Sequence, residues 1–268
     1  MITKTKRGAR QRQSAAARQR GRHSPLPPPR ALSSLTAAIL AGGLGTRLRP
    51  MLADWPKVLA LVHGQPFLVH LLDRLAAAGI RKTVLLTGYR AEQIFQTVGE
   101  TYRGMKLVHS PEPEPLGTGG ALRNALDKLD SANVLLLNGD SWCDVELEDF
   151  WQFYRRSEAA LSMMLARVDD PARFGAVHLR TDGKVLGYRE KQGGGRGWIN
   201  AGIYLMARSL IEEIRQGPVS LEREMLPRWL EHGKRVFAFC QPGTFLDIGT
   251  PASYAIAESV IPVIPEQA

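Results

Sequence analysis

The most constraining stretch of the 268-residue chain is an apolar run that leads directly into glycines and then into cations. It reads Leu35-Thr36-Ala37-Ala38-Ile39-Leu40-Ala41-Gly42-Gly43-Leu44-Gly45-Thr46-Arg47-Leu48-Arg49-Pro50, with Lys57 close behind. A short apolar run is typical of a strand buried on both faces of a parallel sheet. Glycines let the following backbone approach a ligand, and its N–H groups with nearby cations suit an anion. The stretch therefore predicts a polyphosphate-binding loop.

Two familiar phosphate loops do not fit this stretch. The Walker pattern requires Gly-Lys-Ser/Thr, whereas Gly45 is followed by Thr46 and Arg47. The dinucleotide pattern, started at Gly43, meets Leu48 where its third glycine belongs. The loop is therefore of a third kind.

The segments after this loop alternate between helical and strand patterns. We expect helices from Phe67 to Gly79, from Ala91 to Val98 and from about Ala121, and strands at Val84 to Gly88, Met105 to Val108 and Val134 to Leu137. This order predicts an α/β fold with a doubly wound, mostly parallel sheet. In such sheets the ligand binds beyond the carboxyl ends of the strands.

The second half of the chain changes to strands and predicts a smaller mixed part. The expected strands are Leu161 to Val168, Phe174 to Leu179, Val185 to Arg189, Trp198 to Leu205 and Val236 to Phe239, with helices from Ser209 to Arg215 and from Leu221 to Glu231. Thr181-Asp182-Gly183 indicates a hairpin turn. Thr250 and Pro251 indicate the N-cap and first position of a terminal helix.

Two aspartates end apolar segments far apart in the sequence. Asp140 follows the most apolar expected strand, and Asp247 follows Phe245-Leu246. A carboxylate at the mouth of a buried strand is poorly solvated unless it meets a cation, so the two acids are candidates for one Mg²⁺ site. The alternative for Asp140 is that it caps the loop before a helix starting near Glu146.

Six ordered motifs resemble the sugar-1-phosphate nucleotidyltransferases. They are Leu40 to Leu48 with Pro56-Lys57, Gly117-Thr118-Gly119-Gly120-Ala121, Asn138-Gly139-Asp140, Glu190-Lys191, Asn200-Ala201-Gly202-Ile203-Tyr204 and Asp247-Ile248-Gly249-Thr250. The resemblance covers about Leu35 to Ile261 and implies a Rossmann-like nucleotidyltransferase fold with a mixed sugar-binding part. It also implies nucleotidyl transfer from a nucleoside triphosphate to a sugar 1-phosphate, with release of pyrophosphate.

The same resemblance implies site residues. The residues that would contact the nucleotide are Leu40, Ala41, Gly42, Gly43, Gly45, Thr46, Glu112, Gly117 and Thr118. The catalytic residues would be Arg47, Lys57, Asp140 and Asp247, and the two aspartates would bind Mg²⁺. The residues that would contact the sugar phosphate are Gly175, Glu190, Lys191 and Asn200. Arg47 and the loop amides would hold the departing pyrophosphate, and Lys57 would neutralise the α-phosphate. Lys191 would orient the attacking phosphate.

Glu112 bears on the choice of base. Relatives that read uracil or thymine carry a glutamine at this position, five residues before Gly117. An ionised carboxylate only accepts hydrogen bonds, and guanine offers paired donors on N1 and N2. The residue therefore favours GTP, unless Glu112 is an exposed loop acid.

The sugar is less constrained. The short length, Glu112 and the segment from Asn200 to Tyr204 look most like enzymes acting on D-glycero-D-manno-heptose 1-phosphate. Mannose 1-phosphate with GTP is the next alternative, followed by uridylyl or thymidylyl transfer to another sugar 1-phosphate such as N-acetylmuramate 1-phosphate. A non-catalytic regulator that binds sugar nucleotides is the contrasting class.

The formal net charge of +9 lies in the N-terminal segment. Nine of the 35 basic residues precede residue 35 without any acid among them, so the other 26 balance the 26 acids. We expect a disordered basic tail over 1–34, a nucleotidyltransferase domain over 35–261 and a short tail over 262–268. The basic tail is compatible with a polyanion-binding arm, a transit peptide or an over-extended gene start.

Composition limits the remaining classes. No run approaches the ~18 apolar residues of a membrane span, and Cys143 and Cys240 are too few for a disulfide scaffold or a structural zinc site. We therefore expect a soluble cytoplasmic protein without a membrane or nucleic-acid partner for its folded domain. Homo-oligomerisation stays open.

Overall fold

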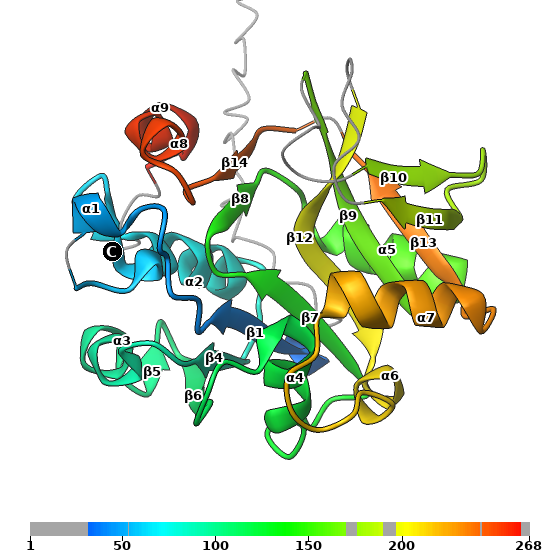
Figure 1. The fold of residues 1–268 in the computed structure, drawn as a ribbon, viewed down its shortest axis with the longest axis horizontal. Coiled ribbons are helices and arrows are strands. Elements are labelled where there is room, and N and C mark those ends of the chain that lie inside the picture. Colours follow the sequence, from blue (N-terminus) through cyan, green and yellow to red (C-terminus); the bar gives the residue numbers. More distant parts are fainter. Residues whose placement is uncertain (1–31, 53, 170–175, 190–196, 242, 264–268) are drawn as a thin grey trace, which may run out of the picture.

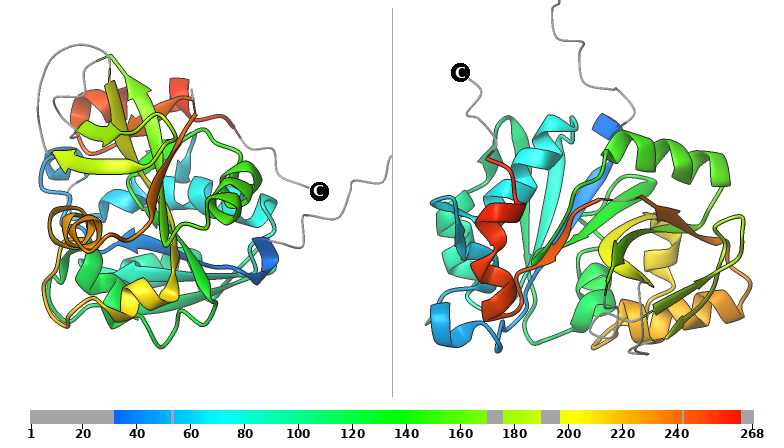
Figure 2. Two further views of the ribbon diagram at one scale, coloured as in Figure 1. Left: turned by 90° about the vertical axis from the view of Figure 1, so that its right-hand side faces the viewer. Right: turned by 90° about the horizontal axis from the view of Figure 1, so that it is seen from above.

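The computed structural model describes residues 32–52, 54–169, 176–189, 197–241 and 243–263 (Figure 1). Their main feature is a ten-stranded sheet in which eight strands follow the order β11-β10-β12-β7-β1-β4-β6-β5. The N-terminal elements lie together on one side of the molecule with α8 and α9, and the later strands lie on the other (Figure 2). No helix in the described part of the chain is long and apolar enough to cross a bilayer.

The centre of the sheet is parallel, as predicted. The strands are β1 (Thr36–Ala41), β4 (Lys82–Thr87), β6 (Met105–Pro111) and β7 (Asn133–Asn138), with β1 between β4 and β7 and β6 beyond β4. Their buried residues alternate between two cores. Ala37 and Ile39 belong to the core that contains residues of α2 and α3, whereas Ala38 belongs to the core that contains residues of α4. Because side chains alternate along a strand, one apolar run fills both cores and the sheet is doubly wound.

The helices of this half occupy the expected segments. They are α2 (Phe67–Ala77), α3 (Ala91–Val98), α4 (Gly117–Asn124) and α5 (Leu147–Ser157). Short elements complete the half: a 3₁₀ turn η1 (Leu32–Ser34), α1 (Arg49–Leu52), a 3₁₀ turn η2 (Lys57–Leu59), β2 (Leu61–Val62), β3 (Gln65–Pro66) and β5 (Thr101–Tyr102). Leu32 is 1% exposed and belongs to the core, so packed structure includes residues that the sequence assigned to the tail.

The mixed part is also confirmed. β12 (Gly197–Ala207) is antiparallel to β7 and to β9 (Leu161–Val168), β13 (Val236–Cys240) is parallel to β9, and β10 (Ala176–Leu179) forms a hairpin with β11 (Val185–Arg189). The helical elements here are α6 (Arg208–Glu212), a π-helical turn η4 (Leu221–Met225) and α7 (Leu226–Glu231), and the chain then returns to the N-terminal side with α8 (Pro251–Ala255) and α9 (Ala257–Val260). Thr250 caps α8 through Ser253 with Pro251 in the first turn, as expected.

The structure corrects two local expectations. Helix α4 begins at Gly117 rather than near Ala121, because Gly119 and Gly120 donate their N–H groups to the carbonyl of Val219 at 2.9 and 3.1 Å. Sequence reasoning also missed a ribbon of two three-residue strands, β8 (Ser141–Cys143) and β14 (Phe245–Asp247). Strands of this length carry too few residues for a periodic pattern.

Candidate active site

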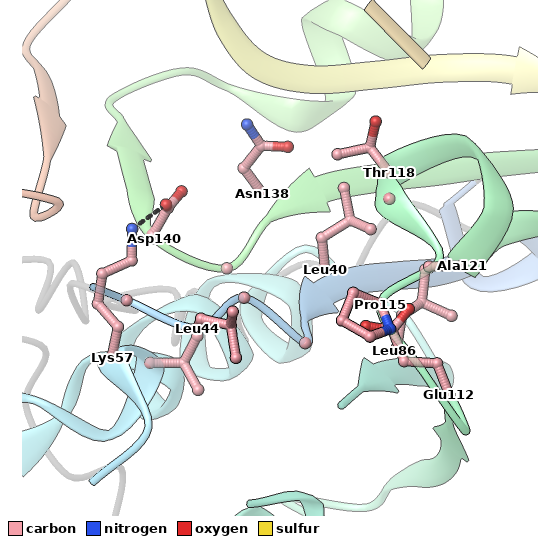
Figure 3. Close-up of a pocket in the computed structure, with 16 residues that line it drawn as sticks. Leu40, Leu44, Lys57, Leu86, Glu112, Pro115, Thr118, Ala121, Asn138 and Asp140 are labelled. Carbon is pink, nitrogen blue, oxygen red and sulfur yellow. Dashed lines mark hydrogen bonds and ion pairs between the residues drawn. The ribbon is translucent and has the colours of Figure 1, made fainter. Parts of the chain in front are cut away.

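A cavity of about 290 Å³ opens at the carboxyl ends of the parallel strands (Figure 3). The register aligns these ends, because Leu40 of β1 lies opposite both Leu86 of β4 and Asn138 of β7. Glu112 follows the last residue of β6 and lines the same cavity. The structure therefore places a pocket where the fold class predicts ligand binding.

The cavity collects most of the residues expected around a nucleotide and its phosphates. Its lining includes Leu40, Gly42, Gly43, Gly45, Lys57, Glu112, Gly117, Thr118 and Asp140. Of the other expected residues, Ala41 is buried, and Thr46 and Arg47 are exposed and outside the lining. Gly175, Glu190 and Lys191 lie outside the described residues.

Sequence reasoning assigned no role to several lining residues. They are Leu44, Val58, Leu86, Pro115, Ala121, Asn138 and Gly139. The alignment of strand ends could have found Leu86, since β4 lies next to β1. The buried Oδ1 atom of Asn138 has no hydrogen-bond partner among the described residues.

The glycine loop packs closely against Lys57. Gly45 has a φ of +57°, and a Cβ at this position would lie 3.0 Å from the Cβ of Lys57. A side chain here would therefore cost backbone strain and move the lysine. The loop keeps the Lys57 ammonium at the cavity, where its side chain is 12% exposed.

Lys57 and Asp140 form an ion pair at one end of the cavity (Figure 3). Ser141 donates its hydroxyl to Oδ1 of Asp140 at 3.1 Å. The β8–β14 ribbon brings Asp247 beside this pair, because Asp247 lies opposite Ser141 and the Ile248 N–H donates to the Asp140 carbonyl at 3.0 Å. Two aspartates separated by more than one hundred residues therefore share one site.

The electrostatics of Asp247 reflect this proximity. Burial raises the pKa of its carboxyl above the ordinary value, and the negative charge of Asp140 adds to the increase. The charges of Lys57 and Arg47 and a 2.6 Å hydrogen bond from the Gly249 N–H act in the opposite direction. A buried carboxylate whose ionisation is disfavoured by a neighbouring carboxylate forms a site where a cation binds favourably.

This donor set fits Mg²⁺ held jointly with phosphates. Within the described ranges, no group of three His, Cys, Asp or Glu side chains could enclose a metal ion. Mg²⁺ is commonly bound by one or two carboxylates together with substrate phosphates rather than by an all-protein cage. The pair of Asp140 and Asp247 matches that requirement.

Glu112 lies at the other end of the cavity from the Lys57–Asp140 pair (Figure 3). It is half-buried, and its Oε2 atom accepts a hydrogen bond from the Leu116 N–H at 3.2 Å. A Cβ at Gly42 would lie only 2.7 Å from Oε1, so the glycine makes room for the carboxylate. Burial raises the pKa of Glu112, against the effect of the Leu116 hydrogen bond.

Asn200 lies on β12, at an irregularity in the pairing with β9. Its Oδ1 atom accepts from the Gly202 N–H at 3.0 Å, and its Nδ2 atom donates to the Tyr204 hydroxyl at 2.5 Å. These two bonds orient the amide. Tyr204 is in turn buried, at 1% exposure.

Comparisons with known proteins identify the family of this chain. The family model for nucleotidyl transferases matches residues 36–262. The chain is 36% identical over 228 residues to "Mannose-1-phosphate guanylyltransferase" of Mycobacterium tuberculosis, covering 84% of this chain and 64% of that protein. It is 34% identical over 225 residues to "D-glycero-alpha-D-manno-heptose 1-phosphate guanylyltransferase" of Aneurinibacillus thermoaerophilus, covering 84% and 97%.

A solved structure gives the same relationship. HddC from Yersinia pseudotuberculosis complexed with GMP-PN superposes with a TM-score of 0.76 at 32% identity, covering 84% of this chain and 98% of that one. This chain therefore shares its fold with HddC along most of its length. It carries the aligned strand ends, the glycine loop and the paired aspartates described above. The chain belongs to the nucleotidyl transferase family.

Proposed function

We propose that this chain transfers GMP from GTP to a sugar 1-phosphate, with D-glycero-D-manno-heptose 1-phosphate as the first candidate, giving a GDP-sugar and pyrophosphate. The observation that carries the proposal is the single cavity with Glu112 at one end and Lys57, Asp140 and the neighbouring Asp247 at the other. The Glu112 carboxylate, which would accept hydrogen bonds from the base, and the Lys57 ammonium, which would neutralise phosphate charge, thus lie at opposite ends of one pocket.

The reaction forms one P–O bond and breaks another. A phosphate oxygen of the sugar 1-phosphate attacks the α-phosphorus of GTP, and the bond from that phosphorus to the bridging oxygen of pyrophosphate breaks. Such transfers depend on positioning and charge stabilisation rather than on a side-chain nucleophile. Lys57 neutralises the α-phosphate, and the Gly42–Gly45 amides with Arg47 hold the pyrophosphate.

The sugar phosphate requires residues from the mixed part of the sheet. Asn200 binds the sugar, and the family resemblance assigns Gly175, Glu190 and Lys191 to the same substrate. These three assignments stay predictions. When bound between Asp140 and Asp247, Mg²⁺ would supply charge neutralisation for the triphosphate.

Glu112 supports GTP over other nucleotides. Its partly buried carboxylate lines the cavity, whereas an exposed loop acid would face solvent. The names of both relatives specify guanylyl transfer, at 36% and 34% identity. An ionised carboxylate accepts the N1 and N2 donors of guanine.

Mannose 1-phosphate is the second candidate for the sugar. The mycobacterial relative is named for mannose 1-phosphate and the Aneurinibacillus relative for the manno-configured heptose. The chain spans about two thirds of the former protein's length and nearly all of the latter's.

The test is pyrophosphate release with Mg²⁺ from GTP, UTP, dTTP, CTP and ATP, each against mannose 1-phosphate, both anomers of the heptose 1-phosphate, glucose 1-phosphate and N-acetylmuramate 1-phosphate. We expect release with GTP and a manno-configured sugar. Pyrophosphate release with UTP or dTTP would reject Glu112 as the residue that selects guanine. Binding of a sugar nucleotide without any pyrophosphate release would instead support the non-catalytic regulator.

A further inference from the structure

The π-helical turn η4 places a carboxylate between the two halves of the proposed site. Glu222 lies on this turn and accepts hydrogen bonds from three hydroxyl groups, of which the neighbouring Ser220 is the most distant, with its Oγ atom 3.4 Å from Oε2. Oε2 accepts from Thr118 at 2.7 Å, and Oε1 accepts from Tyr204 at 3.0 Å. Thr118 lines the cavity at the start of α4, and Tyr204 belongs to β12. The Glu222 carboxylate thus bridges the nucleotide side and the sugar side.

The hydrogen bonds continue from Glu222 to Asn200. The Tyr204 hydroxyl accepts from Nδ2 of Asn200 at 2.5 Å, and Oδ1 of Asn200 accepts from the Gly202 N–H at 3.0 Å. On the other side, the Thr118 hydroxyl accepts from the Leu221 N–H at 2.8 Å. A continuous path therefore joins a cavity-lining hydroxyl to the expected sugar-binding amide.

The chemistry of the carboxylate fixes the direction of every bond along this path. An ionised glutamate can only accept, so the Thr118 and Tyr204 hydroxyls must both donate to it. Because Tyr204 donates to Glu222, it must accept from Asn200, and the Asn200 amide must present its NH₂ group to the tyrosine. One Nδ2–H of Asn200 remains as a donor, and the Thr118 oxygen remains only an acceptor.

We infer that Glu222 is a positioning residue that sets the hydrogen-bond polarity of both substrate subsites, holding Asn200 as a donor toward the sugar 1-phosphate and Thr118 as an acceptor toward the nucleotide. This inference rests on the proposed function, because it assumes that the two subsites belong to one transfer reaction. Glu222 acts through Thr118 and Tyr204 and is not a catalytic residue.

Glu222→Gln tests the polarity without removing volume. The amide offers one acceptor oxygen and one donor NH₂ group, so a hydroxyl that faces the NH₂ group must reverse. The Thr118 bond is the shorter one, and we expect the glutamine oxygen to retain it while the NH₂ group faces Tyr204. The tyrosine proton can then no longer point at residue 222, and we expect it to turn toward Asn200, where it favours a flipped amide that has lost its bond from Gly202.

The expected result is an increase of about tenfold in the KM for D-glycero-D-manno-heptose 1-phosphate, or for mannose 1-phosphate if that is the substrate. The KM for GTP stays within about twofold, since the Thr118 bond is retained. Tyr204→Phe removes the same link and gives a similar increase. The double variant shows no further increase, because both changes break one path.

Glu224→Gln is the matched control, as it lies on the same turn, is exposed and touches neither Thr118 nor Tyr204. Its carboxylate accepts from the Ser220 N–H at 2.8 Å and pairs with Arg215 at 3.2 Å. We expect both KM values of this variant to match those of the unmodified protein. The melting temperature of each variant separates positioning from a loss of packing.

Two outcomes overturn the inference. If Glu222→Gln leaves both KM values equal to those of Glu224→Gln in an active protein, with or without a lower melting temperature, Glu222 is merely structural and the proposed function stands. If the unmodified protein neither turns over nor binds GTP and the sugar 1-phosphates by calorimetry, the proposed function fails and the inference with it.

Discussion

The parallel and mixed parts of the sheet solve the problem of holding a ligand differently. In the parallel part, strands β1, β4, β6 and β7 end in register, and each end or following loop contributes to one cavity. In the mixed part, Asn200 lies within the long strand β12 and is oriented by side-chain bonds. The proposed nucleotide subsite thus follows from backbone topology, and the proposed sugar subsite depends on a side-chain network.

The aspartate pair lies where the two parts meet. Asp140 follows β7 of the parallel part, and Asp247 ends β14, whose only pairing in the described structure is with β8. If the division is correct, changes at this meeting point should affect turnover most. Changes within one part should affect mainly the substrate bound there.

Asp247→Asn should give the largest effect, a loss of turnover of about a thousandfold, since one of the two carboxylates proposed to hold Mg²⁺ is lost. The same change should raise the melting temperature by about 2–4 °C by relieving the repulsion with Asp140. Steady-state pyrophosphate release and thermal unfolding measure both effects. Asp149→Asn, at an exposed position on α5, is the control.

The pH dependence of stability sharpens this prediction. Because the folded-state pKa of Asp247 is raised, the folded protein binds a proton there more readily than the unfolded chain does. The stability contributed by this group is therefore present at low pH and falls as the pH rises through that pKa. Asp247→Asn should remove this contribution to the pH dependence of the melting temperature. If the variant and the unmodified protein show the same pH profile of melting temperature, the proposed repulsion between Asp140 and Asp247 is contradicted.

Lys57→Ala should reduce kcat by about a hundredfold or more, because it removes the charge beside the α-phosphate. The melting temperature should change little, since the Asp140 carboxylate left behind is 32% exposed and can be hydrated. Lys106→Ala, an exposed lysine on β6, is the control. Normal turnover of Lys57→Ala would remove the lysine from the mechanism.

Glu112→Gln should act on the nucleotide side alone. The ratio of kcat/KM for GTP to that for UTP should fall about tenfold, because a carboxylate that accepts two guanine donors is lost. In the unmodified protein the ratio should also fall as the pH drops toward the raised pKa of Glu112, where the carboxyl becomes a donor. Glu114→Gln in the same loop is the control and should keep the GTP-to-UTP ratio of the unmodified protein. If both variants change this ratio equally, Glu112 does not recognise the base.

Asn200→Ala should give the smallest effect and confine it to the sugar side. We expect an increase of about five- to tenfold in the KM for the sugar 1-phosphate, with the KM for GTP unchanged, because one donor is lost. Full kinetic matrices in both substrates measure this. An equal increase in both KM values would show that the two parts do not act separately.

The sequence by itself determined the longer strands and their succession along the chain. Val134 to Leu137 had to be a buried strand because it is wholly apolar, and Thr250-Pro251 had to start a helix because both residues favour that position. The glycine loop after β1 and the acid after β7 were therefore predictable. Their meeting at one sheet edge follows from parallel strand topology.

The tertiary structure alone decided the contacts between distant segments. The start of α4 depends on the Val219 carbonyl, the approach of Asp247 to Asp140 depends on a three-residue ribbon, and the bridge at Glu222 joins residues 118 and 204. None of these leaves a periodic pattern, because each consists of a few hydrogen bonds between segments far apart in the sequence. Local sequence encodes propensity and burial, whereas these bonds exist only once the sheet has brought the segments together.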